Sequence, residues 1–283
     1  MLKPFQALAL AGAMLSLALP AAAQPAPGAF ADVDGGKIHY ETCGSGAQAI
    51  VLLHDGVADS AVWDEVWPGL CKAFRVVRYD RRGYGRSPEA KAPYSPVDDL
   101  VAVMTAAGFD HAALVGSSSG GGLAVDFTLA HPEAVDRLVL VGPSVSGLAF
   151  SAYFIERITE VNQLIGRGDF TGAIKASWVL APGHDAAGQR LLKLLMASPQ
   201  DLHHADPARP APPAAPRLHD IKAPTLILVG DADVADNQAQ AGAVEALVPG
   251  ARRVVVRDAG HLIYLDHPDV FADLVTRFVS GGR

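Results

Sequence analysis

Residues 116–120 read Gly-Ser-Ser-Ser-Gly and follow directly on the apolar run of residues 112–115. A Gly-x-Ser-x-Gly pattern in that place is typical of a sharp strand-to-helix turn, which strains the backbone of its central residue. Glycines are expected at both ends because strand and helix approach too closely there for a side chain. The turn would present Ser118 at the end of a sheet, beside helical N–H groups. The alternative is a Gly/Ser-rich loop without function, because such short patterns also arise by chance.

Strand-like and helix-like stretches alternate from residue 36 onward, which predicts an α/β fold with a mostly parallel sheet covered on both faces. The expected strands are residues 37–42, 49–53, 75–79, 112–115, 135–141, 225–229 and 253–256, with a hairpin-like turn at 43–46 between the first two. The expected helices are residues 60–74 (kinked or split at Pro68), 97–107, 121–130, 238–247 and 270–279.

Residues 144–222 differ in character from the rest of the chain. Residues 147–200 are amphipathic at helical spacing, and residues 207–216 hold five prolines, which favours an extended linker. We therefore expect a helical cap with a Pro-rich linker at 144–222, inserted into an α/β core made of residues 24–143 and 223–283.

The first 23 residues have the pattern of a secretory signal peptide. Lys3 precedes an uncharged apolar run at 7–19, and three alanines at 21–23 precede Gln24. The alternative is a membrane anchor, but the run is short for a span, and Pro20 followed by small residues suits cleavage better. The sequence predicts a signal peptide at 1–23 and a periplasmic or secreted protein.

The charge of the chain argues against several classes of partner. Removing residues 1–23 takes one lysine and no acid from a chain of net charge −7, which leaves −8. Basic residues do not cluster beyond the pairs at 81–82 and 252–253, so we expect neither nucleic-acid binding nor stable membrane association after cleavage. No metal-binding or nucleotide-binding motif is visible, so we expect a small-molecule substrate, no cofactor and no metal.

The chain has two cysteines, Cys43 and Cys71, and both lie in the exported portion. An oxidising compartment favours a disulfide between them. Cys43 ends one expected strand, and Cys71 lies just before another that begins at the same edge of the sheet. We expect a bridge, with two separate buried thiols as the alternative.

A serine nucleophile needs a base and an acid that orients the base, and both are expected in loops at the carboxyl ends of later strands. His261 follows the strand at 253–256 by a short loop, whereas His267 precedes a proline and suits a capping or surface role. Asp233 follows the strand at 225–229 at a distance that lets it reach the histidine. Asp231 is better placed to fix the turn and is the reserve.

Two backbone N–H groups are needed to stabilise an oxyanion. We expect one from Ser119, after the nucleophile, and one from Gly56, in the loop after the strand at 49–53. His54 in that loop is expected to hold the loop in place rather than to carry protons.

The chain resembles the α/β-hydrolase superfamily over nearly all of its mature length, and most closely its single-domain members with a small helical cap. The residues that carry the resemblance are Leu53-His54-Asp55-Gly56 with Trp63, Asp80-Arg81-Arg82-Gly83-Tyr84-Gly85-Arg86-Ser87, the turn at 116–121, His131-Pro132, Gly230-Asp231-Ala232-Asp233 and Gly260-His261. The resemblance implies a catalytic triad of Ser118, Asp233 and His261. The usual His-Gly pair reads His54-Asp55 here, with glycine one place later, so Val57 is the alternative to Gly56 as oxyanion donor.

A serine nucleophile, rather than an aspartate, implies acyl chemistry. The leading hypothesis is a secreted serine hydrolase, of the carboxylic-ester hydrolase class, that cleaves a small ester or lactone through an acyl-enzyme on Ser118. The alternatives are a cofactor-free perhydrolase or haloperoxidase-like enzyme or a C–C bond hydrolase with the same triad, and a non-catalytic ligand-binding protein. Candidate pocket residues are Val57, Trp63, Tyr84, Ser117, Phe150, Tyr153, Phe154 and Trp178.

Overall fold

The computed structural model describes residues 28–176, 185–198 and 207–281. The predicted signal peptide at 1–23 and Trp178 lie outside these ranges. Within them, no helix combines the length and the apolar character that crossing a bilayer requires.

A central sheet runs through the molecule and has the strand order β1-β2-β4-β3-β5-β6-β7-β8 in the described residues. The strand pairs β1–β2 and β2–β4 are antiparallel, and all later neighbours are parallel. The prediction of a mostly parallel sheet is therefore confirmed. The strands are β1 (Ala29–Val33), β2 (Gly36–Cys43), β3 (Ala49–Leu53), β4 (Arg75–Tyr79), β5 (Ala112–Ser117), β6 (Val135–Val141), β7 (Thr225–Gly230) and β8 (Arg252–Val256).

The expected hairpin-like turn at 43–46 is wrong. β4 lies between β2 and β3, so Val76 pairs with Cys43 on one side and with Ile50 on the other. The hairpin of this region is instead β1–β2, whose turn at Asp34-Gly35 was missed. Gly35 has a φ of 69°, a conformation that favours glycine and suits the short loop of an antiparallel hairpin.

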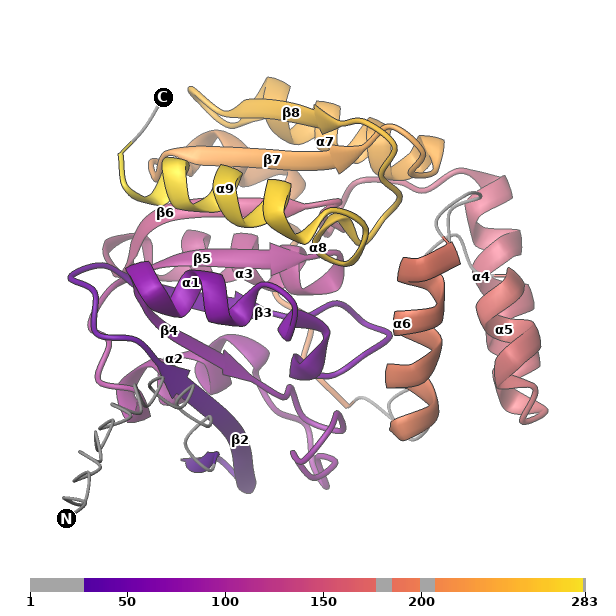
Figure 1. Cartoon of the computed structure of the whole chain (residues 1–283), viewed down its shortest axis with the longest axis horizontal. Helices are drawn as coiled ribbons and strands as arrows, with labels where there is room; N and C mark the ends of the chain where they lie inside the picture. Colours follow the sequence, from indigo (N-terminus) through magenta and orange to yellow (C-terminus); the bar gives the residue numbers. More distant parts are fainter. Residues whose placement is uncertain (1–27, 177–184, 199–206, 282–283) are drawn as a thin grey trace, which may run out of the picture.

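Helices cover both faces of the sheet (Figure 1). Alternate residues of each strand serve the two faces: Ile50 and Leu52 pack into one hydrophobic core, and Val51 and Leu53 into the other. The expected break at Pro68 is present, because a short 3₁₀ turn (Ser60–Trp63) precedes α1. One face carries α1 (Trp67–Ala73), α8 (Ile263–Asp266) and α9 (Pro268–Val279), and the other carries α2 (Pro96–Ala106), α3 (Ser119–Ala130) and α7 (Ala235–Leu247).

Three helices lie in the chain between β6 and β7. In Figure 1 they stand beyond the carboxyl ends of the parallel strands, where the loops of the candidate site also lie. Helix α6 packs against α8 and the 3₁₀ turn before α1. The three are α4 (Ala152–Gly166), α5 (Phe170–Ala176) and α6 (Asp185–Ala197), and a 3₁₀ turn at Ala215–Asp220 leads from them into β7.

Cys43 and Cys71 form a disulfide, with their Cα atoms 5.4 Å apart. The bridge ties the end of β2 to α1, at the edge of the sheet where β4 begins. The expected pairing is confirmed. The disulfide lies at the opposite edge of the sheet from the strand-to-helix turn at Ser118.

Candidate active site

Ser118 joins β5 to α3 in a strained conformation, with φ 51° and ψ −117°. Its N–H donates to the carbonyl of Val141 at 2.9 Å, and this holds the turn to β6. The flanking glycines are sterically required. A Cβ on Gly116 would lie 2.5 Å from the carbonyl oxygen of Gly120, and one on Gly120 would overlap the carbonyl oxygens of β3 and its loop. The expected strand–turn–helix context is present.

The structure brings Asp233 and His261 into contact. Nδ1 of His261 lies 2.9 Å from Oδ2 of Asp233, and their side chains are 2% and 0% exposed. Nε2 of His261 is buried and has no hydrogen-bond partner within the described chain. It is free to accept a proton from Ser118, which lines the same cavity.

The charge around His261 favours its protonated form. Burial is the largest single influence and would lower the pKa of the imidazole, but the charge and hydrogen bond of Asp233 and the charge of Asp55 together outweigh it. The net effect raises the pKa of His261 above its ordinary value. An imidazolium is thereby stabilised where a base would receive the serine proton.

Asn237, on the first turn of α7, is a site residue that the sequence reasoning missed. Its Nδ2 donates to Oδ1 of Asp233 at 2.8 Å and lies 2.9 Å from Nδ1 of His261. Nδ1 of His261 carries a proton when it donates to Asp233, so it cannot also accept from the amide. The amide therefore serves the carboxylate, and the four-residue spacing from Asp233 was the signal that could have found it.

Asp231, the reserve for the acid, and His267 both take structural roles. Asp231 accepts a long hydrogen bond of 3.4 Å from the backbone N–H of Ala259 and so spans the β7 and β8 loops. His267 approaches the carbonyl oxygen of Asp258 through Nε2 at 2.8 Å, and its own carbonyl accepts from the N–H of Phe271 in α9. Both match the turn-fixing and capping roles expected for them.

The peptide between Asp55 and Gly56 is held in one orientation. Its carbonyl oxygen accepts from Nδ1 of His54 at 2.7 Å and from Nη2 of Arg81 at 2.7 Å. In a trans peptide the N–H points opposite to the C=O, so the N–H of Gly56 faces away from both donors. That N–H has no hydrogen-bond partner within the described chain, and Gly56 lines the cavity at Ser118.

Val57 is wrong as an alternative oxyanion donor, because its N–H is already engaged. It donates to Oδ1 of Asp55 at 2.7 Å, and the N–H of Ala58 donates to the same oxygen at 3.1 Å. The side chain of Asp55 thus bends the loop back on itself. Gly56 is left as the donor that this loop can offer.

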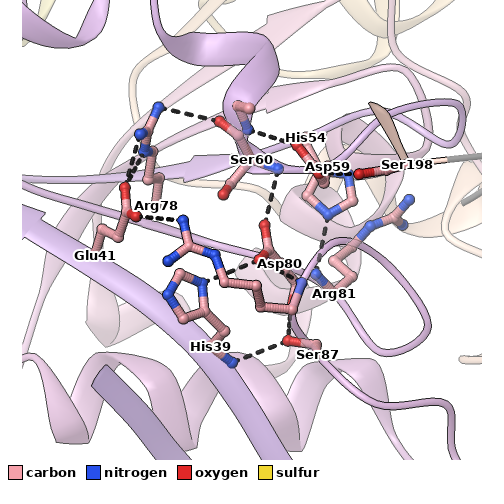
Figure 2. Close-up of polar contacts among 12 residues, drawn as sticks. His39, Glu41, His54, Asp59, Ser60, Arg78, Asp80, Arg81, Ser87 and Ser198 are labelled. Atoms are coloured by element: carbon pink, nitrogen blue, oxygen red, sulfur yellow. Dashed lines mark hydrogen bonds and ion pairs between the residues drawn. The ribbon is translucent and has the colours of Figure 1, made fainter. Parts of the chain in front are cut away.

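His54 connects this loop to a polar cluster built around Asp80 (Figure 2). Nε2 of His54 accepts from the N–H of Arg81 at 2.9 Å, so its proton lies on Nδ1 and the ring is neutral. Oδ1 of Asp80 accepts from the N–H of Ser60, and Oδ2 accepts from His39. Burial opposes the charge of Asp80, but these hydrogen bonds hold its pKa well below the usual range. His54 is therefore structural, as expected.

A cavity of about 210 Å³ lies at Ser118, between the core and α4. Three of the candidate pocket residues, Val57, Phe150 and Phe154, line it. The rings of Phe150 and Phe154 stack with centroids 4.3 Å apart. The lining is completed by Asp55, Gly56, Ser118, Ser119, Ser144, Ile158, Asn237 and His261.

Four candidate pocket residues do not line this cavity. Trp63 is fully buried and packs on Tyr264, with ring centroids 4.2 Å apart, so it belongs to the core. Ser117 is fully buried because alternate strand residues face away from the turn. Tyr84 donates to the carbonyl of Gly56 at 3.2 Å behind the loop, and Tyr153 is 65% exposed on the outer side of α4.

A second cavity of about 580 Å³ adjoins the first and shares Ser119 and Ser144 with it. It runs along the outer face of α3, past Leu123 and Asp126. Burial raises the pKa of Asp126 to about 6, although a hydrogen bond with Ser146 lowers it. Three arginines also line this cavity: Arg81, Arg209 and Arg217.

Known proteins match this chain along most of its length. A hydrolase of 2-hydroxy-6-oxononadienedioate and 2-hydroxy-6-oxononatrienedioate from Klebsiella pneumoniae is 30% identical over 275 residues, covering 89% of this chain and 95% of the relative. The structure of carboxylesterase CesB from Bacillus subtilis is 25% identical, with a TM-score of 0.76 and coverage of 91% and 92%. That of Est816, an N-acyl homoserine lactone degrading enzyme, is 26% identical, with a TM-score of 0.73 and coverage of 88% and 100%.

The profile of the alpha/beta hydrolase family matches residues 50–274, which include the turn at Ser118 and both of its candidate partners. The fold of this chain also agrees with that of the solved carboxylesterase over most of both chains. This chain therefore belongs to the α/β-hydrolase family.

Proposed function

We propose that this protein is a serine hydrolase that cleaves a small carboxylic ester or lactone through an acyl-enzyme on Ser118. The observation that carries the proposal is the buried contact between His261 and Asp233, at 2.9 Å, with Nε2 of His261 unpartnered in the described chain and Ser118 lining the same cavity as His261. This arrangement supplies a base, an acid that orients it and a nucleophile.

In the proposed reaction, Ser118 attacks the carbonyl carbon while Nε2 of His261 takes the hydroxyl proton. Asp233 stabilises the imidazolium, and the N–H groups of Gly56 and Ser119 stabilise the oxyanion. His261 then gives the proton to the leaving alkoxide. A water molecule, deprotonated by His261, attacks the acyl-enzyme and releases the acid.

The cavity at Ser118 favours a small uncharged acyl or alkoxy group. Its volume of about 210 Å³ is below the ~300 Å³ at which pockets for drug-sized ligands begin. Its wall is apolar at Val57, Phe154 and Ile158, and no lysine or arginine lies among its described lining residues. A substrate carboxylate buried there would find no lysine or arginine among those residues to pair with.

The second candidate is hydrolysis of a C–C bond beside a carbonyl in a dicarboxylate. The Klebsiella relative is named for a dienedioate, and three arginines line the adjoining cavity, where a distal carboxylate would find a cation. For that reaction, Arg209→Ala should raise KM for a dienedioate and leave turnover of p-nitrophenyl butyrate unchanged.

Labelling with a fluorophosphonate probe tests the proposed function. The wild type should be labelled and Ser118→Ala should not, and p-nitrophenyl acetate and butyrate should be turned over faster than the decanoate. An unlabelled wild type would favour a ligand-binding protein. Labelling without ester or lactone turnover would favour the C–C substrate, or peracid formation from acetate and hydrogen peroxide.

We also propose that the mature protein works in the periplasm or outside the cell. The signal-like pattern at 1–23 and the disulfide between Cys43 and Cys71 both support export. Mass spectrometry of the protein from a cell fractionation should find an N-terminus at Gln24.

A further inference from the structure

A buried side-chain network connects three segments of the chain that meet at the candidate site. The hydroxyl of Tyr264 donates to Oδ2 of Asp55 at 2.9 Å and lies 3.0 Å from Oγ of Ser117. A phenol has one proton and a carboxylate only accepts, so Ser117 donates to the oxygen of Tyr264. All three residues are essentially buried.

Each member of the network belongs to a different part of the site. Asp55 is in the oxyanion loop after β3, Ser117 precedes the nucleophile at the end of β5, and Tyr264 lies three residues after His261. The other oxygen of Asp55 accepts from the N–H groups of Val57 and Ala58. A single carboxylate therefore shapes the oxyanion loop and joins it to the other two segments.

We propose that Asp55 is a positioning residue of this enzyme, which locks the oxyanion loop to the nucleophile and histidine loops through Tyr264. This inference rests on the proposed serine hydrolysis. It also accounts for the aspartate at the place where a glycine is usual, since the turn closed by its side chain presents the N–H of the next residue, Gly56, at the cavity.

The charge of Asp55 has a consequence for pH. Its carboxylate favours protonated His261, in the same direction as Asp233 but more weakly. Two carboxylates act on the imidazole: Asp233 from the β7 loop and Asp55 from the β3 loop. The neighbouring groups are neutral Tyr264 and Asp266, both on α8, and the Arg81 cation, which binds the Asp55 carbonyl. The positive charge of Arg81 acts on the pKa of His261 in the opposite direction to the negative charge of Asp55. Removing the aspartate charge therefore makes the environment of the imidazole more positive and lowers the pKa of His261.

The variant Asp55→Asn removes the negative charge of residue 55 but keeps its hydrogen-bonding geometry. An asparagine oxygen can still accept from Val57 and Ala58, and its amide can donate to Tyr264, which then donates to Ser117. We expect the acidic limb of kcat/KM to move to lower pH by at least about half a unit, which is about a 3-fold higher rate on that limb relative to the plateau.

Two further variants test the positioning role. Asp55→Ala should lower kcat by about 100-fold with little change in KM, because the oxyanion contact forms only in the transition state. Tyr264→Phe should lower kcat by about 10-fold, because it leaves Asp55 and Ser117 without their shared partner. Tyr79→Phe is the matched control, since Tyr79 is also buried and its hydroxyl has no partner within the described chain.

All variants are measured by thermal unfolding, by ester turnover against pH and by the rate of fluorophosphonate labelling. The inference is overturned if Asp55→Asn keeps the wild-type pH profile, or if Tyr264→Phe matches Tyr79→Phe in kcat. If Asp55→Ala does not fold, Asp55→Asn and Tyr264→Phe still test the inference. An unlabelled wild type overturns the proposed function and this inference with it, whereas a labelled wild type with unchanged variants overturns this inference alone.

Discussion

The amide of Asn237 donates to one oxygen of Asp233 at 2.8 Å, while the other oxygen of that carboxylate faces His261. The N–H of Val234 donates to the first oxygen as well, also at 2.8 Å. Two donors on one side of the carboxylate leave the second oxygen as the acceptor for the imidazole. The orientation of Asp233 is thus set by α7 before any substrate binds.

Replacing Asn237 should therefore affect turnover more than binding. Asn237→Ala removes one donor from Asp233, and we expect kcat to fall by about 10-fold with KM nearly unchanged. Steady-state kinetics with p-nitrophenyl butyrate measures this.

Asn237→Asp is the companion variant. It adds a second negative charge beside Asp233, which should raise the pKa of His261 and move the acidic limb of kcat/KM to higher pH. An Asn237→Asp profile that stays at the wild-type pH would contradict the geometry described for this amide.

The glycine that follows Ser118 by two residues should not tolerate a methyl group. In Gly120→Ala the new Cβ would overlap the carbonyl oxygens of Leu53 and His54, so β3 and α3 must separate. We expect a loss of about 3 kcal/mol or more in the free energy of unfolding, measured in urea, and loss of activity in the folded fraction.

Gly166→Ala is the control for that substitution. Gly166 ends α4, has no atom within 4 Å of an added Cβ and does not have a positive φ. The same change there should be neutral or should stabilise by up to about 1 kcal/mol. Similar losses at both glycines would show that close packing at the turn is not the cause.

The disulfide should contribute to stability without affecting catalysis. A bridge across a sequence separation of 28 residues stabilises by about 3–4 kcal/mol in the chain-entropy account. The variant Cys43→Ser/Cys71→Ser should therefore unfold at a lower temperature and keep its kcat, because the bridge lies far from Ser118. Dithiothreitol should lower the Tm of the wild type to that of the double variant and leave the variant itself unchanged. A reductant effect on both proteins would point to another target.

Asp126 should make the protein less stable as the pH rises from about 4 to 6. Burial raises the pKa of this carboxyl to about 6 from a usual 3.8, so the folded state binds its proton more tightly than the unfolded state. The contribution of Asp126 to the free energy of unfolding is therefore largest below about pH 4, and it is lost as the pH rises through about 6. Because solvent still reaches part of the carboxyl, we expect a difference of about 1 kcal/mol.

Asp126→Asn removes this dependence. Urea unfolding at pH 4 and pH 7 should show the wild type losing more stability than the variant between the two values. Equal losses in both proteins would assign the pH dependence to other groups.

Local patterns in the sequence predicted most of the elements, because each strand and helix carries its own periodicity. These local patterns did not predict the order of the strands in the sheet. Cys43 and Ile50 are near neighbours in the chain, but β4 enters the sheet between their strands, and that choice is made by contacts distant in sequence. Only the Asp34-Gly35 dipeptide carried a local signal for the β1–β2 hairpin.

In the candidate site, too, local patterns predicted some features, and contacts between distant residues decided the others. The sequence placed Asp233 and His261 in loops at one edge of the sheet, and the structure shows the two in contact. Trp63 was a candidate pocket residue, but its ring packs in the core against Tyr264 and Phe271. The role of Tyr264 depends on which side chains meet in space, and no motif encodes that, whereas the only local signal for Asn237 was its four-residue spacing from Asp233.

All of the site loops leave one edge of the sheet, and the opposite edge consists of connections such as residues 107–111 before β5 and 248–251 before β8. A tag or tether attached at those connections would fix the enzyme to a support with its cavity turned outward. Immobilised in this way, the protein should keep its access to substrate, whereas attachment through the cap helices would block it.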